Sequence, residues 1–324
     1  MSTDDGQLKK VPTTQSGRHV DVVVPVRNGA EWLAALIKQL DRQQVPPGVV
    51  VRWFFVDDGS TDTTLDVLER VSDPRSNVLS LPENMGRAAA RNAGVAAGNG
   101  QLLLLLDADC VPHVGLVREH LSNIESGLDI SFGPVTGMGE GFWAAYQSRV
   151  ACEREKKAGS GDFLAMTTAN AMIKREVFEQ VGGYDEAYRY YGFEDRDLVH
   201  RLLTAGAKAG FSDQAAVEHR LQPDLRRMCD HMLESGAFTA ALFRQRFPDS
   251  YRKSAFARFD RTRVGVIPRL FLDAATSQRE FLLRVTDALV CKNGVPFALK
   301  LFLVRACVGL SYYAGTIQQA EAES

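Results

Sequence analysis

Five consecutive leucines, Leu102 to Leu106, run directly into Asp107-Ala108-Asp109. A run this apolar predicts a buried strand, and in extended chain the two carboxylates share one face. Carboxylates are costly to bury unless they meet a cation or hydrogen-bond donors. The pattern therefore predicts that this strand ends at a sheet edge, where Asp107 and Asp109 meet a cation or ligand hydroxyls.

Strand-like and helix-like segments alternate through the first third of the chain. Apolar runs predict strands at residues 19–26, 49–56, 78–81 and 102–106. Between them, helical spacing and capping residues predict helices at residues 31–40 and 61–71, and an alanine-rich run that stops at Gly98 predicts a helix at residues 87–97. Alternation of this kind indicates an α/β fold, with a mostly parallel sheet covered by helices and ligands beyond the carboxyl ends of the strands.

After Asp109 the regular alternation ends. We expect strands at 130–135, 165–173 and 215–217, helices at 142–157, 176–181 and 194–205, and a flexible loop at 137–141. Beyond residue 222 the chain is helical in character and basic around residues 244–269. This indicates three parts: a disordered leader at 1–17, an α/β domain at 18–221 divided near residue 110, and a helical region at 222–324.

Composition excludes several classes of protein. With 38 Lys and Arg against 40 Asp and Glu, the 324-residue chain has a net charge of −2, which does not favour nucleic acid as a partner. The five cysteines are widely spaced and include no CxxC pair, so neither a disulfide framework nor a zinc site is indicated. The polar N-terminus does not resemble a signal peptide, and a cytoplasmic location is expected.

A second carboxylate pair follows another predicted strand. Asp57-Asp58-Gly59-Ser60 comes directly after residues 49–56, so both pairs should project from the same sheet edge and serve one ligand. Helix capping and turn formation are the alternative roles for either pair. Because carboxylates repel phosphates, a nucleotide here would place its base and ribose on one pair and its diphosphate on a divalent cation held by the other.

Other nucleotide-binding patterns are absent. Residues 24–29 lack the G-x-G-x-x-G of dinucleotide-binding folds, and no Walker sequence occurs. Arg87 and Arg91 lie on the predicted third helix, whose N-terminus could present amides to an anion; a solvated basic face is the alternative.

Taken in order, five motifs resemble those of family 2 inverting glycosyltransferases of the GT-A fold. They are Pro25-Val26-Arg27-Asn28, Asp57 to Asp62, Asn84-Met85-Gly86 with Arg91-Asn92, Asp107-Ala108-Asp109, and Gly182 to Glu186 followed by Gly192 to Leu198. The resemblance covers about residues 20–219. It departs from the family at Gly192-Phe193, where Gly-Gly is frequent, which implies a narrower or aromatic acceptor pocket.

The resemblance implies a role for each matching residue. Asp57 would bind the edge of uracil or another nucleobase, Asp58 or the nearby backbone the ribose, and Asp107 the ribose or donor sugar. The other expected donor contacts are Pro25, Val26, Arg27, Asn28, Asn84, Gly86 and Arg91. Asp109 and His219 would hold Mn²⁺ or Mg²⁺, with Glu218 as an alternative ligand. Asn170, Gly183, Phe193 and Glu194 would face the acceptor or sugar, and Asp195 would be the catalytic base. A buried strand Asn and an ordinary acidic first helical turn are the structural alternatives for Asn170 and for Glu194 to Asp197.

The apolar tail permits two interpretations. Residues 295–317 are interrupted by Lys300 and Arg305, and the uncharged stretch 306–320 is short for a hydrocarbon core of about 30 Å. In the first interpretation, Phe297, Leu301, Phe302, Val308 and Tyr312 enter a membrane interface beside the basic segment 244–269, so that the protein is peripheral on the inner face of the cell membrane. In the second, these helices pack on the α/β domain or on a second subunit of a homo-oligomer.

The predicted function is an inverting transfer of one sugar from a nucleoside-diphosphate donor, most simply UDP-linked, to a hydroxyl of a glycan or lipid-linked acceptor in polysaccharide, envelope-glycan or glycolipid synthesis. A sugar-phosphate nucleotidyltransferase would instead need a Gly-rich, basic loop after the first strand, where this chain has residues 25–29. A non-catalytic sugar-nucleotide-binding protein should have lost Asp109 or Asp195, and both are present.

Overall fold

The computed structural model describes residues 17–71, 73–220 and 224–322. The expected leader lies outside the described residues except for Gly17, and the expected boundary at residue 221 lies in the second gap. A seven-stranded sheet has the order β3-β2-β1-β4-β8-β6-β9. Its strands are β1 (Arg18–Val26), β2 (Val49–Asp57), β3 (Ser76–Ser80), β4 (Leu102–Leu106), β6 (Ile130–Phe132), β8 (Asn170–Lys174) and β9 (Ala209–Phe211).

The expectation of a mostly parallel sheet is confirmed. Strands β3, β2, β1 and β4 run parallel, and β8 pairs antiparallel with β4 and β6. The five leucines of β4 are all buried, because β1 and β8 flank the strand and helices cover both faces. Alternate leucines contact opposite layers, as the two-residue period of a strand requires.

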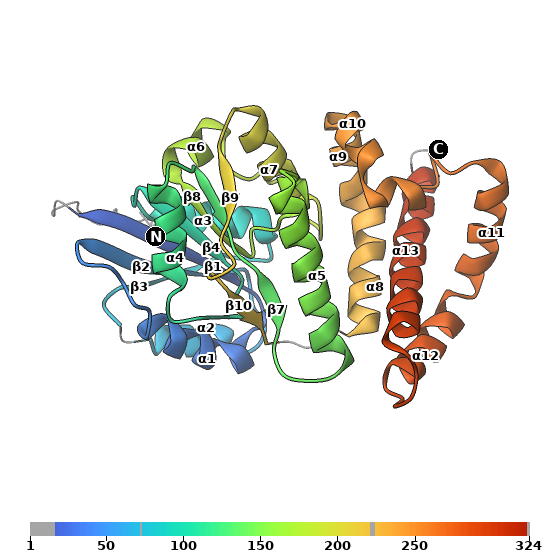
Figure 1. Cartoon of the computed structure of the whole chain (residues 1–324), viewed down its shortest axis with the longest axis horizontal. Helices are drawn as coiled ribbons and strands as arrows, with labels where there is room; N and C mark the ends of the chain where they lie inside the picture. Colours follow the sequence, from blue (N-terminus) through green and yellow to red (C-terminus); the bar gives the residue numbers. More distant parts are fainter. Residues whose placement is uncertain (1–16, 72, 221–223, 323–324) are drawn as a thin grey trace, which may run out of the picture.

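Each face of the sheet has its own helical layer (Figure 1). One layer contains α1 (Ala30–Asp41), α2 (Thr64–Glu69) and α4 (Leu116–Glu125), which bury Leu33, Leu36, Leu68 and Leu121 against the sheet. The other contains α3 (Arg87–Ala97), α6 (Arg175–Gln180) and α7 (Glu194–Thr204), which bury Val95, Phe178, Leu198 and Leu202. The carboxyl ends of β1, β2 and β4 open between these layers.

Residues 130–135, expected as one strand, form parts of two sheets. Strand β6 ends at Phe132, and β7 (Val135–Gly137) joins a small sheet of order β5-β10-β7 with β5 (Cys110–Pro112) and β10 (Val217–His219). The break is at Gly133-Pro134, because proline has no N–H for a ladder and a Cβ on Gly133 would lie 2.0 Å from the Ala215 carbonyl oxygen. The strand expected at 165–173 likewise begins only at Asn170, after a 3₁₀ turn (Phe163–Ala165).

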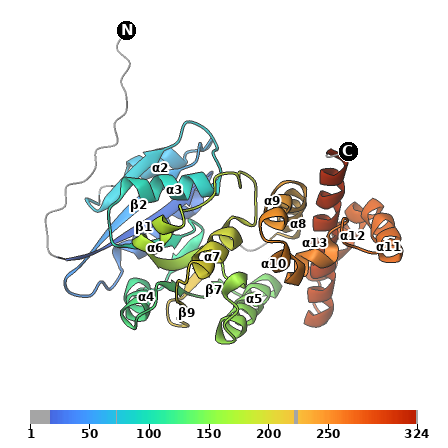
Figure 2. The ribbon, with the colours of Figure 1, turned by 90° about the horizontal axis from the view of Figure 1, so that it is seen from above.

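The C-terminal region forms a helical layer beside α5 (Phe142–Gly159), at the far end of the molecule from β2 and β3 (Figures 1 and 2). Its helices are α8 (Leu225–Glu234), α9 (Ala240–Arg246), α10 (Pro248–Lys253), α11 (Val266–Ser277), α12 (Arg279–Val290) and α13 (Phe297–Ala322), with a π-helical turn at Ser235–Thr239 and a 3₁₀ turn at Ala255–Phe259. Helix α13 crosses α8 closely, because Gly315 has no side chain; a Cβ there would lie 2.1 Å from the Leu233 carbonyl oxygen.

The packing of α13 corrects part of the expectation for the tail. Tyr312, expected at a membrane interface, is buried and its hydroxyl is 2.7 Å from that of Tyr251. In the basic segment, Arg244 and Arg261 are paired with Asp260 and Asp273. By length and composition alone, Phe297–Ala320 could cross a membrane, although 44% of its most apolar window is buried inside the protein.

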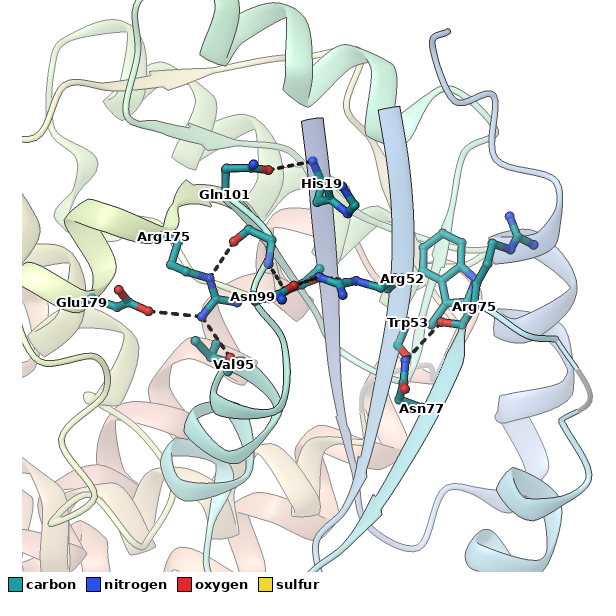
Figure 3. Close-up of polar contacts among 12 residues, drawn as sticks. His19, Arg52, Trp53, Arg75, Asn77, Val95, Asn99, Gln101, Arg175 and Glu179 are labelled. Atoms are coloured by element: carbon teal, nitrogen blue, oxygen red, sulfur yellow. Dashed lines mark hydrogen bonds and ion pairs between the residues drawn. The ribbon is translucent and has the colours of Figure 1, made fainter. Parts of the chain in front are cut away.

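A charged cluster lies in the amino-terminal half of β1, away from the carboxyl ends of the strands. Asp21 is fully buried and accepts hydrogen bonds from Arg52 at 2.7 Å, Arg175 at 2.9 Å and the Gly100 amide at 2.6 Å. Figure 3 shows Arg52 and Arg175 approaching from β2 and from the start of α6, with Glu179 beside Arg175. This cluster joins three elements of the sheet layer and takes no part in the cleft described below.

Candidate functional site

Three adjoining cavities form one cleft beyond the carboxyl ends of β1 and β4, and all three are lined by Arg87 and Asp107. The strand-end cavity, of about 110 Å³, is lined by Pro25, Val26, Arg27, Asp58 and Asp109 among others. The central cavity, of about 350 Å³, extends to α5 and α8, and the helix-side cavity, of about 220 Å³, reaches the start of α7. The cleft therefore brings together most of the residues that the sequence singled out.

Asp58 holds the loop that carries Asn84 and Gly86. Its two carboxylate oxygens accept hydrogen bonds from the amides of Met85, at 2.7 Å, and Gly86, at 3.1 Å. Burial raises the pKa of Asp58, and the two amides partly oppose that rise. Gly86 has φ 92° and a Cβ there would lie 2.7 Å from the Arg189 carbonyl oxygen, so this loop closes against the 188–193 loop only with glycine. Asn84 is exposed.

Asp57 presents a buried acceptor. The side chain is 2% exposed, and its Oδ1 has no hydrogen-bond partner among the described residues. Its Oδ2 accepts a long hydrogen bond of 3.4 Å from the Ser60 amide. Asn28 lies beside it in a left-handed conformation, and its Oδ1 accepts from the Thr61 amide at 2.8 Å, which joins the loops after β1 and β2. A buried, unpaired carboxylate oxygen is costly unless a ligand N–H or O–H reaches it.

Asp109 and His219 converge because β5 and β10 pair beside the end of β4. His219 is opposite Cys110 in the small sheet, and its Nε2 is 3.2 Å from Asp109 Oδ2. Burial alone would raise the pKa of Asp109, but His219 and Arg87 outweigh it and hold that pKa below its usual range. Glu218, the alternative ligand, turns toward His113 at 4.0 Å and is half-exposed.

This pair suits a divalent cation that a diphosphate also coordinates. Among the described residues, no group of three or more His, Cys, Asp or Glu side chains could hold a metal ion. Mg²⁺ in nucleotide sites uses one or two carboxylates and completes its shell with water and phosphate oxygens, and imidazole is acceptable to Mn²⁺. Asp109 and His219 therefore fit a shared protein–ligand metal site and not an all-protein cage.

Arg91 lies beneath the cleft and pairs with three carboxylates. It is 1% exposed, and its guanidinium nitrogens lie 2.7 Å from Asp107, 3.2 Å from Asp195 and 3.9 Å from Glu194. Burial alone would lower the pKa of Arg91, but its aromatic and acidic neighbours raise it well above the ordinary value. Because these carboxylates surround it, Arg91 links Asp107 after β4 to the start of α7.

Glu194 and Asp195 begin α7 in different electrostatic states. Asp195 Oδ2 accepts from Thr167 Oγ1 at 2.7 Å and from the Thr168 amide at 3.2 Å, and its Oδ1 accepts from Thr168 Oγ1 and from Arg91. Burial opposes ionisation, but Arg91 and the threonines keep the pKa of Asp195 below its usual value. Burial and the neighbouring charge of Asp195 raise the pKa of Glu194 to about 7. Two adjacent carboxyls with separated pKa values are typical of sites that handle protons.

Phe193 positions this acidic pair. It has φ 68°, an unusual conformation for a bulky residue, and its ring is buried against Phe243 at 5.2 Å and Phe256 at 5.0 Å. Strained backbone persists where surrounding packing holds it, which here is the C-terminal helical layer. Phe193 is also one of the residues that line the helix-side cavity.

Besides Asn28, Asp57, Asn84 and Gly86, which line none of the three cavities, two further expected residues lie outside the cleft. Asn170 is fully buried, with its Oδ1 2.9 Å from His120 Nε2 and its Nδ2 2.7 Å from the Ala215 carbonyl oxygen. Gly183 lies beside Phe178, and its carbonyl accepts from Arg201 at 2.8 Å. Neither lines any of the three cavities.

The central cavity also contains residues that sequence reasoning missed. Arg154 of α5 and Arg227 and His231 of α8 line it, and Tyr191 stacks on His231 with ring centroids 4.1 Å apart. Arg87 lies 4.8 Å over the Tyr191 ring. Arg154, Arg227 and His231 belong to no local sequence motif. A basic side chain on an amphipathic helix is equally consistent with a solvent-exposed face.

The sequence models of two protein families match parts of the chain. "Glycosyl transferase family 2" matches residues 21–182, half of the chain, and "N-terminal domain of galactosyltransferase" matches residues 149–224. Among curated proteins, the pre-mycofactocin glycosyltransferase of Mycobacterium tuberculosis is 30% identical over 225 residues, covering 66% of this chain and 45% of that protein. Succinoglycan biosynthesis protein ExoA of Rhizobium meliloti is 29% identical over 209 residues, covering 60% and 61% respectively. The chain thus spans about half to three-fifths of these relatives.

Solved structures share the fold across nearly the whole chain. The mannosyltransferase PcManGT of Pyrobaculum calidifontis, in complex with GDP-Man and Mn²⁺, has a TM-score of 0.58 at 17% identity, covering 98% of this chain and 92% of that one. TarS 1-349 of S. aureus, in complex with UDP, has a TM-score of 0.53 at 17% identity, covering 94% and 92%.

Proposed function

Because the chain belongs to glycosyltransferase family 2, we propose that it transfers one sugar from a nucleoside-diphosphate donor to a hydroxyl of a glycan or lipid-linked acceptor, with inversion at the anomeric carbon. The observation that carries this proposal is the single cleft in which the Asp109–His219 pair and the Glu194–Asp195 pair share the walls formed by Arg87 and Asp107. Inversion needs a base opposite a stabilised leaving group, and this arrangement supplies both ends.

Asp57 is assigned to bind the nucleobase of the donor. Its orphaned Oδ1 can accept one N–H from a base edge, while Oδ2 already receives the Ser60 amide. Because each carboxylate oxygen can accept two hydrogen bonds, Asp57 can bind either the ring N–H of uracil or the ring N–H and amino group of guanine. The UDP in the TarS 1-349 complex supports a UDP-linked donor, whereas the PcManGT complex contains GDP-Man.

Asp109 and His219 are assigned to a divalent ion, Mn²⁺ or Mg²⁺, and the Mn²⁺ in the PcManGT complex supports this assignment. When bound, such an ion supplies charge stabilisation to the departing diphosphate. Arg87 and Arg227 line both the strand-end and central cavities and add positive charge beside the pair. Arg91 is engaged by carboxylates, so it acts on Asp107 and Asp195 and not directly on the diphosphate.

Asp195 is assigned as the base that accepts the proton of the acceptor hydroxyl. Arg91, Thr167 and Thr168 hold it ionised at neutral pH and fix its orientation. Glu194, with a pKa of about 7, is partly protonated there and can donate a hydrogen bond to an acceptor oxygen. Asp197, two residues on, turns away: Oδ1 accepts from Arg201 at 2.5 Å and Oδ2 from the Tyr188 hydroxyl at 3.2 Å.

Calorimetric titration of UDP in the presence and absence of Mn²⁺ tests the metal-dependent donor site. Asp109→Ala should remove the Mn²⁺-dependent part of the affinity, a loss of about 10–100-fold. Glu218→Gln is the matched control, because this neighbouring carboxylate faces away from the cleft, and it should bind as the unaltered protein does. Unchanged Mn²⁺-dependent affinity in Asp109→Ala would remove Asp109 from the site.

A further inference from the structure

Exposed apolar side chains are concentrated in the last three helices. Helix α11 contributes Val266, Ile267, Leu270 and Phe271, each between 65% and 73% exposed. Their spacing of one, three and one residues places them on one side of the helix, and no residue of α11 is fully buried. An apolar helical face this open is unusual in a protein surrounded only by water.

Helix α12 and the start of α13 extend this surface. Phe281 is 63% exposed and Phe302 is 67% exposed, and Leu282, Val285, Phe297 and Leu299 are exposed as well. Both views of the ribbon place α11 and α12 outermost, on the side of α13 away from the sheet (Figures 1 and 2). We call the exposed apolar residues of α11, α12 and the first turns of α13 the apolar face.

The same region is strongly basic although the whole chain is not. Between residues 244 and 305 there are 13 Lys and Arg against five Asp and Glu, in a chain whose net charge is −2. Several of these cations form ion pairs within the protein, as Arg279 does with Asp230. Arg263, Arg284 and Lys292 are exposed and have no carboxylate within ion-pair distance in the described part of the chain. The apolar face is therefore accompanied by unpaired positive charge.

The positive charge of this region distinguishes between the two simplest partners for the apolar face, a second copy of the chain and a lipid surface. A second copy related by a twofold axis would bring this basic region against itself, and like charges across an interface oppose association. An anionic lipid surface supplies the complementary charge, while its boundary region accepts Phe, Ile and Leu side chains. We propose that the apolar face docks the protein onto an anionic membrane surface, with α11 and α12 lying in the interface. This proposal does not rest on sugar transfer.

The test uses the full chain and vesicles of phosphatidylcholine with or without phosphatidylglycerol, in a co-sedimentation assay. The protein should bind the anionic vesicles, and bind less as salt rises. Ile267→Gln with Phe271→Gln should lower the partition constant at least about tenfold, since each side chain loses its apolar burial. Val114→Gln, which alters an exposed valine on the α/β domain, is the matched control and should leave binding unchanged.

A second pair of variants separates charge from apolar burial. Arg263→Glu with Arg284→Glu should also lower binding to anionic vesicles at least about tenfold, because each cation near such a surface contributes about a fivefold factor. Arg42→Glu with Arg70→Glu changes the net charge equally, at exposed positions far from the apolar face in sequence, and should have little effect. Absence of binding to anionic vesicles, or equal binding by all variants, would overturn the proposal. So would a dimer, seen by analytical ultracentrifugation, that Ile267→Gln with Phe271→Gln dissociates while vesicle binding persists.

Discussion

Glu194 and Asp195 are neighbours in sequence, yet their surroundings give them opposite protonation tendencies. Asp195 receives hydrogen bonds from Thr167, Thr168 and Arg91, whereas Glu194 is buried 3.9 Å from Arg91, with the charge of Asp195 beside it. Ionising Glu194 therefore costs the folded protein stability.

Glu194→Gln should stabilise the protein in a pH-dependent manner. The folded-state pKa of Glu194 is raised to about 7 from an ordinary value of 4.5, so the folded state binds the extra proton between these values. The resulting penalty is absent below about pH 4.5 and complete above about pH 7, so the advantage of Gln should grow by roughly 1–3 kcal/mol between pH 5 and pH 8. Urea unfolding at both pH values measures it, and an equal difference at both would contradict the raised pKa.

The variant Asp57→Asn tests whether Asp57 binds the nucleobase of the donor. Losing a charged acceptor for a buried N–H should weaken UDP binding with Mn²⁺ by roughly 10–100-fold, the scale of a hydrogen bond to a charged group. Inorganic diphosphate, which lacks a base, provides the control ligand and should bind both proteins alike. An equal loss for diphosphate would show that Asp57 supports the fold of the cleft and not the base.

At the scale of residues, sequence could predict where the strand-end carboxylates lie, but little of the cation pairing. Asp57, Asp107 and Asp109 follow strands, so their place at one sheet edge follows from local pattern. The ion-pair partners of Arg91 cannot be predicted from local pattern, because Asp195 lies 104 positions away and α7 meets α3 only through the tertiary fold. Asn170 reads alike as a ligand or as an interior residue until His120 is seen beside it.

At the scale of elements, Asp21 illustrates how the sheet layer is held. Asp21→Ala should destabilise the protein by about 3–5 kcal/mol, because it leaves Arg52 and Arg175 without the buried charge that they share. Asp213→Ala, at an exposed position, should stay within about 0.5 kcal/mol of the unaltered protein. Urea denaturation of both variants measures this difference in stability. Similar unfolding midpoints for Asp21→Ala and Asp213→Ala would mean that Arg52 and Arg175 regain full hydration.

The early elements were predictable because the strands are apolar runs and the helices show either helical spacing or, in α3, a run rich in alanine. Predicted residues 87–97 and 102–106 coincide with α3 and β4. The division of residues 130–135 between two sheets was not predictable from sequence. Gly133-Pro134 looks like a small irregularity there, and the break that it causes depends on the distant Ala215 carbonyl. That break matters for the site, since β7 and β10 in the small sheet carry His219 to Asp109.

At the scale of the whole molecule, the C-terminal helices support the cleft and provide the apolar face. Helix α8 lines the central cavity, and Phe243 and Phe256 hold Phe193 in its strained conformation. The helical character of this region was readable from sequence, but not which side of each helix is buried. The tail residue Tyr312 proved to be interior, while the residues of α11 proved to be exposed.

The proposed reaction is an inverting, metal-dependent transfer with Asp195 as the catalytic base. When water replaces the acceptor, the anomer of the sugar released from α-linked UDP-hexoses with Mn²⁺ can be followed by proton NMR before mutarotation. The β anomer should appear first, and Asp195→Asn should lower its rate of formation at least about 10²-fold while UDP affinity persists. Release of the α anomer, or an undiminished rate in Asp195→Asn, would contradict it.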